Sequence, residues 1–278
     1  MGALVWLASY PKSGNTWLRA FLHNLLRAPA RPMNINEIDS FTLGDSQAAW
    51  YRALTDRAPD QLSPEELAEL RPKAHRAMMK AHPDSVFVKT HSYLGENSGV
   101  PLITMDCTAG AIYVVRNPLD VVLSFADHFG LSIDKAMEAM ARDNGVAAPT
   151  ERNVSEFIGS WSMHVKSWTQ RPNSQLLVLR YEDMLDTPFK AFGRTAKFLG
   201  LEPPRARLAK AIRFSSFKTL RSQEDAAGFK ERSDKSRRFF RAGKKNQWKD
   251  KLTPEQVRAI IDRHREQMSR FGYIPEGY

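Results

Sequence analysis

A lysine, a glycine and two hydroxyl side chains lie at a predicted strand-to-helix turn close to the start of the chain. The apolar run that begins at Leu4 stops at Pro11, and apolar residues resume at helical spacing up to Leu26. Gly14 lets the backbone approach a ligand closely, and the helix that follows offers N–H groups to an anion. Gly and Asn alone would suffice for a structural turn, so Lys12 indicates an anion-binding loop.

The residue order in this loop differs from that of a Walker A motif. Walker A reads GxxxxGK[ST], with the lysine after the glycine, whereas here Lys12 precedes Gly14 and the hydroxyls come from Ser13 and Thr16. The pattern therefore predicts a phosphate loop of a different type. A capped turn without a ligand is the alternative.

A second candidate for anion binding is the segment VVRNPLDVVLSFADHF. Arg116 ends a predicted strand, and Ser124 lies two helical turns further on. The planar guanidinium of arginine can hold a phosphate through two hydrogen bonds. The alternative is a structural ion pair between Arg116 and Asp120 at the start of the helix.

A histidine that could accept a proton follows another predicted strand, in the segment FVKTHS. His91 lies at the strand end, and the reference pKa of histidine, about 6.5, makes it a suitable base at neutral pH. His128, one turn after Ser124, is the competing candidate. His164 and His264 lie in predicted helices and are interpreted as structural or solvated.

Positive charge is concentrated at the C-terminal end. The net charge is +10, and residues 201–278 carry 20 Lys and Arg against 10 Asp and Glu, while residues 1–200 carry 21 of each. Such a face can be a solvated surface, a contact for nucleic acid or one wall of a pocket for a small polyanion. Arg241 and Gly243, beside aromatic residues in FFRAGKKNQWK, favour a lid over an anionic ligand.

Composition limits the other possibilities. A chain of 278 residues allows one large domain, and with no linker or repeat we predict a single domain over residues 1–278. No apolar stretch is long enough to span a membrane, and the N-terminus lacks a signal-peptide pattern. Cys107 is the only cysteine, which excludes an intrachain disulfide. We expect a cytoplasmic protein, with Cys107 a buried apolar residue rather than a nucleophile.

Short apolar runs alternate with stretches of helical periodicity, so the predicted fold class is α/β with a central parallel sheet flanked by helices. The predicted strands are residues 4–9, 85–90, 111–116 and 175–181, and the predicted helices are residues 17–26, 117–129, 154–168, 189–200 and 254–272. Ligands bind at the carboxyl edge of such sheets. The segments YPKSGNTW, KTH, RNP and YED, which follow the strands, are therefore expected to lie at this edge.

These segments, together with GSWSMHVKSW and FFRAGKKNQW, resemble in order and spacing the soluble sulfotransferases that use 3′-phosphoadenosine 5′-phosphosulfate (PAPS). The resemblance extends from Leu4 to about residue 250 and includes bacterial members that act on natural products. It implies a P-loop-like nucleotide-binding architecture. It also implies an activity, the transfer of a sulfuryl group to a hydroxyl of a small phenol, alcohol or natural product, with PAP as the second product and no metal.

The resemblance also implies roles for individual residues. The catalytic residues would be His91 as base, Lys12, Lys89 and Ser124. The residues that bind the cofactor would be Lys12, Ser13, Gly14, Asn15, Thr16, Trp17, Arg116, Ser124, Tyr181, Ser215, Ser216, Phe217, Arg241, Ala242 and Gly243. Asn15 and Ala242 depart from the animal enzymes, which usually carry Thr and Lys there. Asn15 keeps the backbone donor. Cofactor binding through the loop that contains Ala242 is expected to be weaker unless Lys244 and Lys245 substitute for the missing lysine.

Two other functions remain as alternatives. A P-loop phosphotransferase would share the sheet and the anion loop, but it should show Walker A order and a strand-end Asp for Mg²⁺. A nucleic-acid-binding protein would use the basic C-terminus, with salt-dependent affinity, and would leave KTH and PKSGNT unexplained. The acceptor and the oligomeric state stay open. Phe41, Trp50, Tyr51, Phe125 and Phe129 are candidates for an apolar acceptor site or for ordinary core packing.

Overall fold

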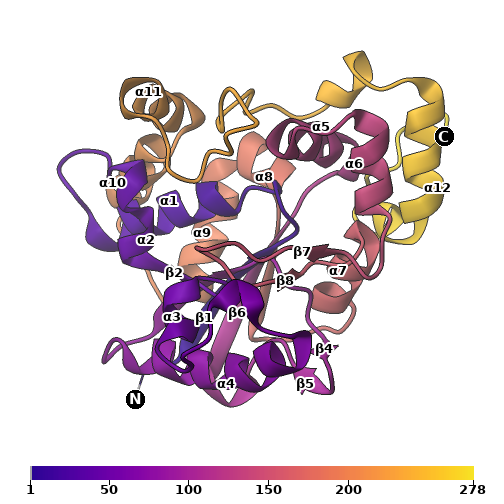
Figure 1. Cartoon of the computed structure of the whole chain (residues 1–278). Coiled ribbons are helices and arrows are strands. Elements are labelled where there is room, and N and C mark those ends of the chain that lie inside the picture. Colours follow the sequence, from indigo (N-terminus) through magenta and orange to yellow (C-terminus); the bar gives the residue numbers. More distant parts are fainter. Residues whose placement is uncertain (1) are drawn as a thin grey trace. The chain divides into compact units, whose positions relative to one another are not determined.

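The computed structural model describes residues 2–278 and shows an α/β fold (Figure 1). Its residues group into two compact units that alternate along the chain. Of the described residues, unit 1 comprises residues 2–10, 42–113 and 140–178, and unit 2 comprises residues 11–41, 114–139 and 179–278. The predicted single domain is not tested by this grouping and stays a prediction.

A five-stranded sheet has the strand order β2-β3-β1-β6-β9. The strands are β1 (Leu4–Ser9), β2 (Thr42–Gly44), β3 (Val86–Thr90), β6 (Thr108–Val115) and β9 (Leu176–Arg180). β3 pairs in parallel with both β1 and β2, with Leu7 and Gly44 each opposite Lys89. The chain passes from unit 1 to unit 2 within β6 and within β9.

The four predicted strands are confirmed as β1, β3, β6 and β9, although buried and partly buried residues alternate along β3 and β9. All six residues of β1 are buried, as expected of a strand covered on both faces. The edge strand β2 was not predicted, since its three residues are too few to show a periodic pattern. Two short antiparallel pairs, β4 (Glu96–Asn97) with β5 (Val100–Pro101) and β7 (Val146–Ala147) with β8 (Glu156–Phe157), also belong to unit 1.

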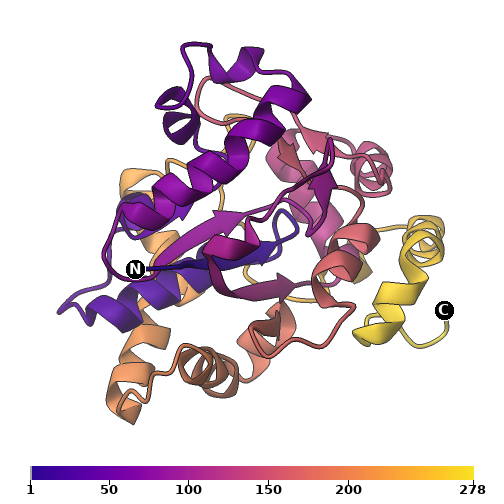
Figure 2. The ribbon, with the colours of Figure 1, turned by 90° about the horizontal axis from the view of Figure 1, so that it is seen from below.

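The helices of unit 1 include one long helix, α4, which packs against β1 (Figure 2). The helical segments are α3 (Ala48–Arg52), η2 (Pro59–Gln61), α4 (Pro64–Lys80), η3 (Met105–Cys107) and α7 (Trp161–Thr169). α4 was missed, although it begins with a capping box in which Ser63 and Glu66 each bond the other's backbone N–H. This reciprocal arrangement is a recognised helix-start signature.

The remaining helices belong to unit 2, apart from the last residue of α6. They are α1 (Asn15–Arg27), η1 (Ile35–Glu37), α2 (Ile38–Phe41), α5 (Pro118–Phe129), α6 (Ile133–Met140), α8 (Tyr181–Asp186), α9 (Pro188–Phe198), α10 (Arg205–Phe214), α11 (Phe217–Ala227), η4 (Gln247–Asp250) and α12 (Pro254–Arg270). The predictions for α1, α5, α9 and α12 are confirmed within two residues at each end.

The helix predicted over residues 154–168 is wrong in its first half. Glu156 and Phe157 form β8, and Gly159 has a φ of 65°. The helix α7 begins only at Trp161, where the Ser160 side chain accepts a hydrogen bond from Met163 N. A glycine in the left-handed region followed by a serine N-cap separates the two elements.

Candidate active site

The predicted anion loop in unit 2 has a backbone suited to its proposed role. Lys12 and Gly14 have positive φ values of 66° and 110°, and α1 begins directly after Gly14 without a side-chain cap. An N-terminus without such a cap presents backbone N–H groups and the positive end of the helix dipole. Lys12 adds a charge beside them, so the loop is chemically suited to an anion.

Gly14 is required here for two reasons. Its φ lies in the region that residues with a side chain rarely adopt. In addition, a Cβ at this position would lie 2.7 Å from Tyr181 Cδ2. Tyr181 therefore packs directly on the loop, and its ring also contacts Trp17, with 5.6 Å between the ring centroids.

Arg116 joins the loop to α5. Its NH1 donates to Lys12 O at 3.0 Å and lies 3.5 Å from Ser124 Oγ. The guanidinium carbon lies 4.2 Å from the centroid of the Tyr181 ring, a cation–π contact. Four residues that sequence reasoning assigned to one site, Lys12, Arg116, Ser124 and Tyr181, are thus brought together.

Three buried polar atoms around this loop have no hydrogen-bond partner within the described part of the chain. They are Ser13 Oγ, Trp17 Nε1 and Arg116 Nε. Buried donors without partners are costly and call for an explanation. All three can donate, so a ligand rich in anionic oxygen atoms would satisfy them. The residues present therefore fit a nucleotide carrying phosphate groups.

The basic loop after Phe240 is held to α5 by a residue that sequence reasoning did not assign to the site. The buried carboxylate of Asp120 accepts hydrogen bonds from Asn246 N at 2.7 Å and Trp248 N at 3.2 Å. Arg116 NH2 also lies 3.4 Å from Lys244 O. The sequence suggested Asp120 only as a partner for Arg116; its contacts 126 and 128 residues away leave no local signal.

The segment 215–217 contacts the basic loop through its aromatic residue. A Cβ on Gly243, whose φ is 61°, would lie 2.3 Å from the Phe217 ring, so this position requires glycine. Phe217 and Trp17 both pack against one apolar cluster. The two serines already have helical partners: Ser215 Oγ donates to Ala211 O at 2.9 Å, and Ser216 caps α11.

The remaining residues of the basic loop that were predicted to bind the cofactor are Arg241 and Ala242, with Lys244 and Lys245 as possible substitutes. Arg241 and Ala242 are partly buried, and Arg241 O accepts a hydrogen bond from Arg221 NH1 at 3.0 Å. Lys245 forms an ion pair with Asp186. The Lys245 side chain is engaged in this pair, whereas Lys244 is exposed. Lys244 is therefore the better candidate to replace the lysine that the animal enzymes carry at the position of Ala242.

Lys12 has two close contacts besides its place in the loop. Its Nζ lies 3.7 Å from the centroid of the Phe239 ring and 3.5 Å from His128 Nδ1. Thr16 Oγ1 lies 3.4 Å from Glu231 Oε2. His128, the competing candidate for a base, is thus a neighbour of the lysine in this structure.

His91 belongs to unit 1, where a short hydrogen bond to the Ser9 backbone sets its tautomer and Ser9 Oγ lies 3.4 Å from the same ring nitrogen. Its Nδ1 lies 2.8 Å from Ser9 O, and because a carbonyl oxygen only accepts, Nδ1 carries the hydrogen. Nε2 of the neutral ring then carries the lone pair. This is the tautomer that a proton-accepting His91 needs at Nε2.

His164 supports His91 from the buried side. Its Nε2 donates to His91 O at 3.1 Å, and its Nδ1 accepts from the Tyr113 hydroxyl at 2.8 Å. Burial lowers the pKa of His164 to about 3, so the ring is neutral and this pattern of one donor and one acceptor persists. The structural interpretation of His164 is confirmed.

Glu156 is a second residue near His91 that sequence reasoning missed, because it was placed in a helix. Its carboxylate accepts a hydrogen bond from the His91 backbone. Burial raises the pKa of Glu156, and the nearby charge of Lys89 partly opposes this. Lys89 and His91, both predicted catalytic residues, are therefore linked to the same carboxylate.

Comparison with known proteins identifies the family. The sulfotransferase domain family matches residues 3–272. The chain belongs to the sulfotransferase family. Flavonol 4′-sulfotransferase of Flaveria chlorifolia is 25% identical over 283 residues, which cover 97% of this chain and 80% of that protein. Cytosolic sulfotransferase 17 of Arabidopsis thaliana is 25% identical over 299 residues, covering 94% of this chain and 83% of that protein.

Solved structures show the same fold. Retinol dehydratase in a complex with retinol and PAP superposes on this sulfotransferase with a TM-score of 0.64 at 21% identity, covering 95% of this chain and 81% of that chain. The predicted fold class is therefore confirmed. The family match over residues 3–272 confirms the predicted family and decides between the two predicted transferases, in favour of sulfuryl over phosphoryl transfer.

The described part of the sulfotransferase also bears on the predictions for membrane spans, metal sites and Cys107. Among residues 2–278, no helix combines the length and apolar character needed to cross a bilayer. The described residues include no group of three or more His, Cys, Asp or Glu that could hold a metal ion. Cys107 is buried, and burial raises the pKa of its thiol to about 11, which makes it a poor nucleophile at neutral pH.

Proposed function

We propose that this sulfotransferase transfers a sulfuryl group from PAPS to the hydroxyl of a small apolar molecule, with His91 as the base. The observation that supports PAPS as the sulfuryl donor is the anion loop of unit 2, where Ser13, Trp17 and Arg116 each bury a hydrogen-bond donor that has no partner among residues 2–278. Retinol dehydratase, which has the same fold, is known in a complex with PAP. The donor set here suits that nucleotide.

The residues of unit 2 divide the work of holding the nucleotide. Lys12 and the N–H groups at the start of α1 bind the 5′ end, where the sulfate and phosphate charges are. Arg116 and Ser124, with the loop of Arg241 and Gly243, bind the 3′-phosphate. The rings of Trp17, Tyr181 and Phe217 enclose the adenine, while the hydroxyls of Ser215 and Ser216 serve the ends of α10 and α11.

When bound, PAPS supplies the sulfuryl group and the leaving phosphate. His91 Nε2 accepts the proton of the acceptor hydroxyl, because Nδ1 is committed to Ser9 O. Lys12 holds a fixed positive charge where negative charge develops on the leaving group, and such preorganised charge is a large part of enzymatic catalysis. Lys89, whose charge lies near Glu156, assists at the group being transferred.

The acceptor is proposed to be an apolar alcohol or phenol, because the neighbour of known structure is in a complex with retinol, an apolar alcohol. Of the aromatic candidates, Tyr51 is fully buried and its hydroxyl donates to Asp45 O. Phe41 stacks on His23 with 4.7 Å between the ring centroids. These contacts favour core packing for both. A screen of phenols, steroids, sugars and antibiotic aglycones would identify the acceptor.

We further propose that the enzyme works in the cytoplasm and does not bind nucleic acid in its function. The name of the Arabidopsis relative, a cytosolic sulfotransferase, supports the location. The basic C-terminal part is explained by a nucleotide that carries several negative charges. A DNA duplex should accordingly bind weakly and with strong salt dependence.

The test combines nucleotide binding with the variant His91→Ala. Calorimetry in EDTA should show micromolar binding of PAP to the wild type and to the variant, with much weaker binding of ATP and of a DNA duplex. Turnover of the variant should fall by about 10²- to 10⁴-fold, the usual contribution of a general base. His82→Ala, which changes an exposed histidine, is the control and should keep full activity.

The possible results separate the two parts of the proposal. Turnover of His91→Ala within tenfold of the wild type would show that His91 is not the base, and His128 would be tested next. Failure of PAP to bind, or a requirement for a divalent metal, would instead refute the assignment of the donor site.

A further inference from the structure

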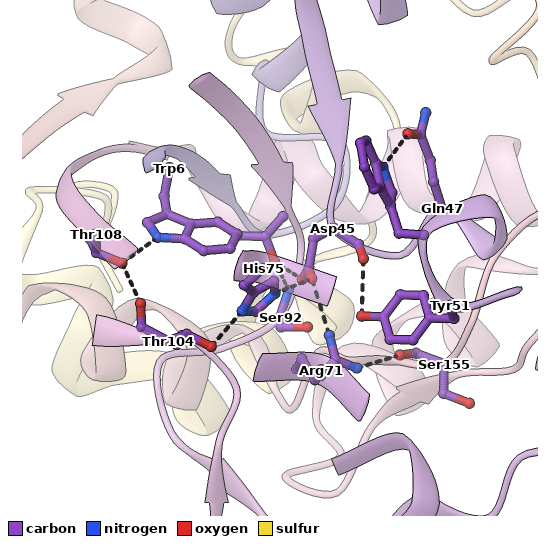
Figure 3. A network of polar contacts seen from close by, with 12 residues as sticks. Trp6, Asp45, Gln47, Tyr51, Arg71, His75, Ser92, Thr104, Thr108 and Ser155 are labelled. Carbon is purple, nitrogen blue, oxygen red and sulfur yellow. Dashed lines mark hydrogen bonds and ion pairs between the residues drawn. The ribbon is translucent and has the colours of Figure 1, made fainter. Parts of the chain in front are cut away.

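A buried polar network in unit 1 has no part in the function proposed above. Its centre is the carboxylate of Asp45, the residue that directly follows β2 (Figure 3). The Asp45 side chain is fully buried. Asp45 Oδ1 accepts a hydrogen bond from Arg71 NH1 at 3.2 Å and lies 2.9 Å from His75 Nε2. Asp45, Arg71, His75, Thr90 and Thr104 are called the Asp45 network below.

Asp45 is ionised in this network. Burial alone would raise the pKa of its carboxyl group, but the charge of Arg71 and the hydrogen bonds from His75 and Thr90 hold it below the usual value. An ionised carboxylate only accepts hydrogen bonds. Arg71, His75 and Thr90 must therefore each direct a hydrogen at Asp45, which sets the direction of these three bonds.

Thr90 connects this network to His91. The Thr90 hydroxyl donates to Asp45 Oδ2 at 2.8 Å, and its oxygen accepts from Ser92 N at 3.1 Å. The two bonds are compatible only in this direction, because Asp45 cannot donate. The hydroxyl thereby closes a turn over His91 and fixes the backbone on both sides of that residue, as a threonine side chain does in an ST turn.

The backbone of Asp45 holds the strand that leads into this turn. Asp45 N donates to Lys89 O at 3.0 Å, and Gly44 of β2 is paired with Lys89 of β3. The backbone of Asp45 thus bonds Lys89, and its side chain bonds the next residue, Thr90. The end of β3 is anchored at the two positions just before His91.

Arg71 extends the support to the other neighbour of His91. Arg71 NH2 donates to Ser155 O at 3.2 Å, and the adjacent residue, Glu156, accepts a hydrogen bond from the His91 backbone. The same ion pair therefore restrains β3 through Thr90 and the start of β8 through Ser155. His91 directly follows Thr90, and its backbone bonds Glu156, which directly follows Ser155, so both restraints act on residues next to His91 or bonded to it.

We propose that Thr90, held by Asp45, is a positioning residue for sulfuryl transfer: it fixes the His91 turn so that the ring keeps its bond to Ser9 O and presents Nε2 to the acceptor. The inference rests on the proposed role of His91 as base. Neither residue takes part in proton transfer itself. Small displacements of a catalytic group can cost about 100-fold in rate, so a side chain that fixes the turn matters for kcat.

The variant that tests this is Thr90→Val, which removes the hydroxyl but keeps the branched shape favoured in strands. We expect kcat to fall about 10- to 100-fold, with the KM for PAPS and the affinity for PAP within twofold of the wild type. Thr90→Ser, which restores the hydroxyl, should return kcat to within about threefold. Asp45→Asn is less suitable, because it would leave the buried charge of Arg71 unpaired.

The matched control is Thr104→Val. Thr104 is also buried, and its Oγ1 lies 2.7 Å from His75 Nδ1 on the far side of the same network. The substitution removes a buried hydrogen bond that does not bear on His91, whereas Thr90→Val removes the two bonds of the Thr90 hydroxyl. Its melting temperature should fall, by less than that of Thr90→Val, while kcat stays within twofold of the wild type.

A second readout does not depend on turnover. In histidine-selective NMR of the nucleotide-free protein, the ring signal of His91, assigned by its loss in His91→Ala, should shift or broaden in Thr90→Val. In Thr104→Val the signal of His75 should shift and that of His91 should not. An unchanged His91 signal in Thr90→Val would overturn the proposal.

The double variant separates failure of this inference from failure of the base assignment. In the His91→Ala background, Thr90→Val should lower the residual rate by no more than twofold, because there is no ring left to position. An undiminished loss in that background, or a Thr90→Val enzyme with kcat within twofold of the wild type, would overturn the positioning role. If His91→Ala itself stays active within tenfold, the proposed base is wrong.

Discussion

Individual residues around the anion loop show how a nucleotide site is prepared before its ligand arrives. Ser13, Trp17 and Arg116 each bury a donor atom that finds no hydrogen-bond partner in the described part of the chain. The free energy lost by leaving such donors unpaired, about 1–3 kcal/mol each, is recovered when a ligand supplies acceptors. A ligand with many anionic oxygens recovers more of this free energy than a ligand with few acceptors, so the unpaired donors make the site selective for such a ligand.

Gly14 allows a direct test at the scale of one residue. In Gly14→Ala the new Cβ would meet the Tyr181 ring at 2.7 Å, at a φ of 110°. Either Tyr181 or the loop must move, so we expect the affinity for PAP, measured by calorimetry, to fall at least tenfold. Gly200→Ala is the matched control, because Gly200 also has a positive φ, 69°, but no atom within 4 Å of the added Cβ.

The left-handed conformation alone costs a residue with a side chain about 1–2 kcal/mol, and both variants should show this as reduced stability. Only Gly14→Ala should also lose nucleotide affinity. Binding of PAP within threefold of the wild type in Gly14→Ala would contradict the assignment of this loop to the nucleotide.

At the scale of elements, α5 organises most of the proposed nucleotide site. Arg116 precedes it, Ser124 lies within it, and Asp120 in its first turn accepts two backbone hydrogen bonds from the basic loop. One helix therefore sets the positions of a guanidinium, a hydroxyl and a loop that comes more than 120 residues later. The role proposed for Asp120 is to hold that loop in place.

This role of Asp120 predicts the behaviour of Asp120→Asn. The amide group offers one acceptor instead of two, so either Asn246 N or Trp248 N loses its partner. We expect the free energy of unfolding to fall by about 1–3 kcal/mol and the affinity for PAP to fall several-fold as the loop loosens. Trypsin should also cleave faster after Lys244.

The control for this prediction is Asp183→Asn, which alters a more exposed carboxylate that pairs with Arg180 at 3.5 Å. It should leave tryptic cleavage and PAP affinity unchanged. If Asp120→Asn leaves the rate of cleavage after Lys244 unchanged, Asp120 does not hold the loop in solution.

Elements with strong local patterns were predictable from the sequence, and tertiary contacts were not. β1 and α5 were found because burial on both faces of a strand and the Asn-Pro start of a helix leave clear local patterns. The loop residues that follow the strands could be chosen because parallel strands end at one edge. By contrast, the link from Asp45 to Thr90 joins residues 45 positions apart, and no spacing rule connects them.

For the whole molecule, the dependence of stability on pH follows from one histidine in each unit. Burial lowers the pKa of His164 in unit 1 to about 3. Burial, with Arg27 and Arg19 nearby, lowers that of His23 in unit 2 to about 4. In the unfolded chain both titrate near 6.5, so below that pH the unfolded state binds more protons than the folded state.

Stability should consequently be lost as the pH falls from about 6.5 toward 4, with each histidine contributing up to about 1.4 kcal/mol per pH unit. Above about 6.5 both histidines are neutral in both states and contribute no slope. Asp45, whose pKa is lowered, stabilises the fold above the unfolded value near 3.9 and loses this contribution only at lower pH. The pKa of Glu156 is raised. As the pH rises above the pKa of an unfolded glutamate, Glu156 therefore lowers the free energy of unfolding, which is opposite to the effect of the two histidines.

Urea denaturation at pH 7.5, 6.5, 5.5 and 4.5 measures this dependence, and a variant isolates the part due to one residue. His164→Gln should reduce the slope between pH 6.5 and 4.5 by about 1 kcal/mol per unit, whatever its effect on stability at pH 7.5. The exposed residue His82 provides the control, since His82→Gln should leave the slope unchanged. A slope in His164→Gln equal to that of the wild type would mean that His164 accepts a proton in the folded protein near pH 6. Protonation would place a hydrogen on Nδ1, so the bond that Nδ1 accepts from the Tyr113 hydroxyl would be lost in mildly acidic solution, while Nε2 would still donate to His91 O.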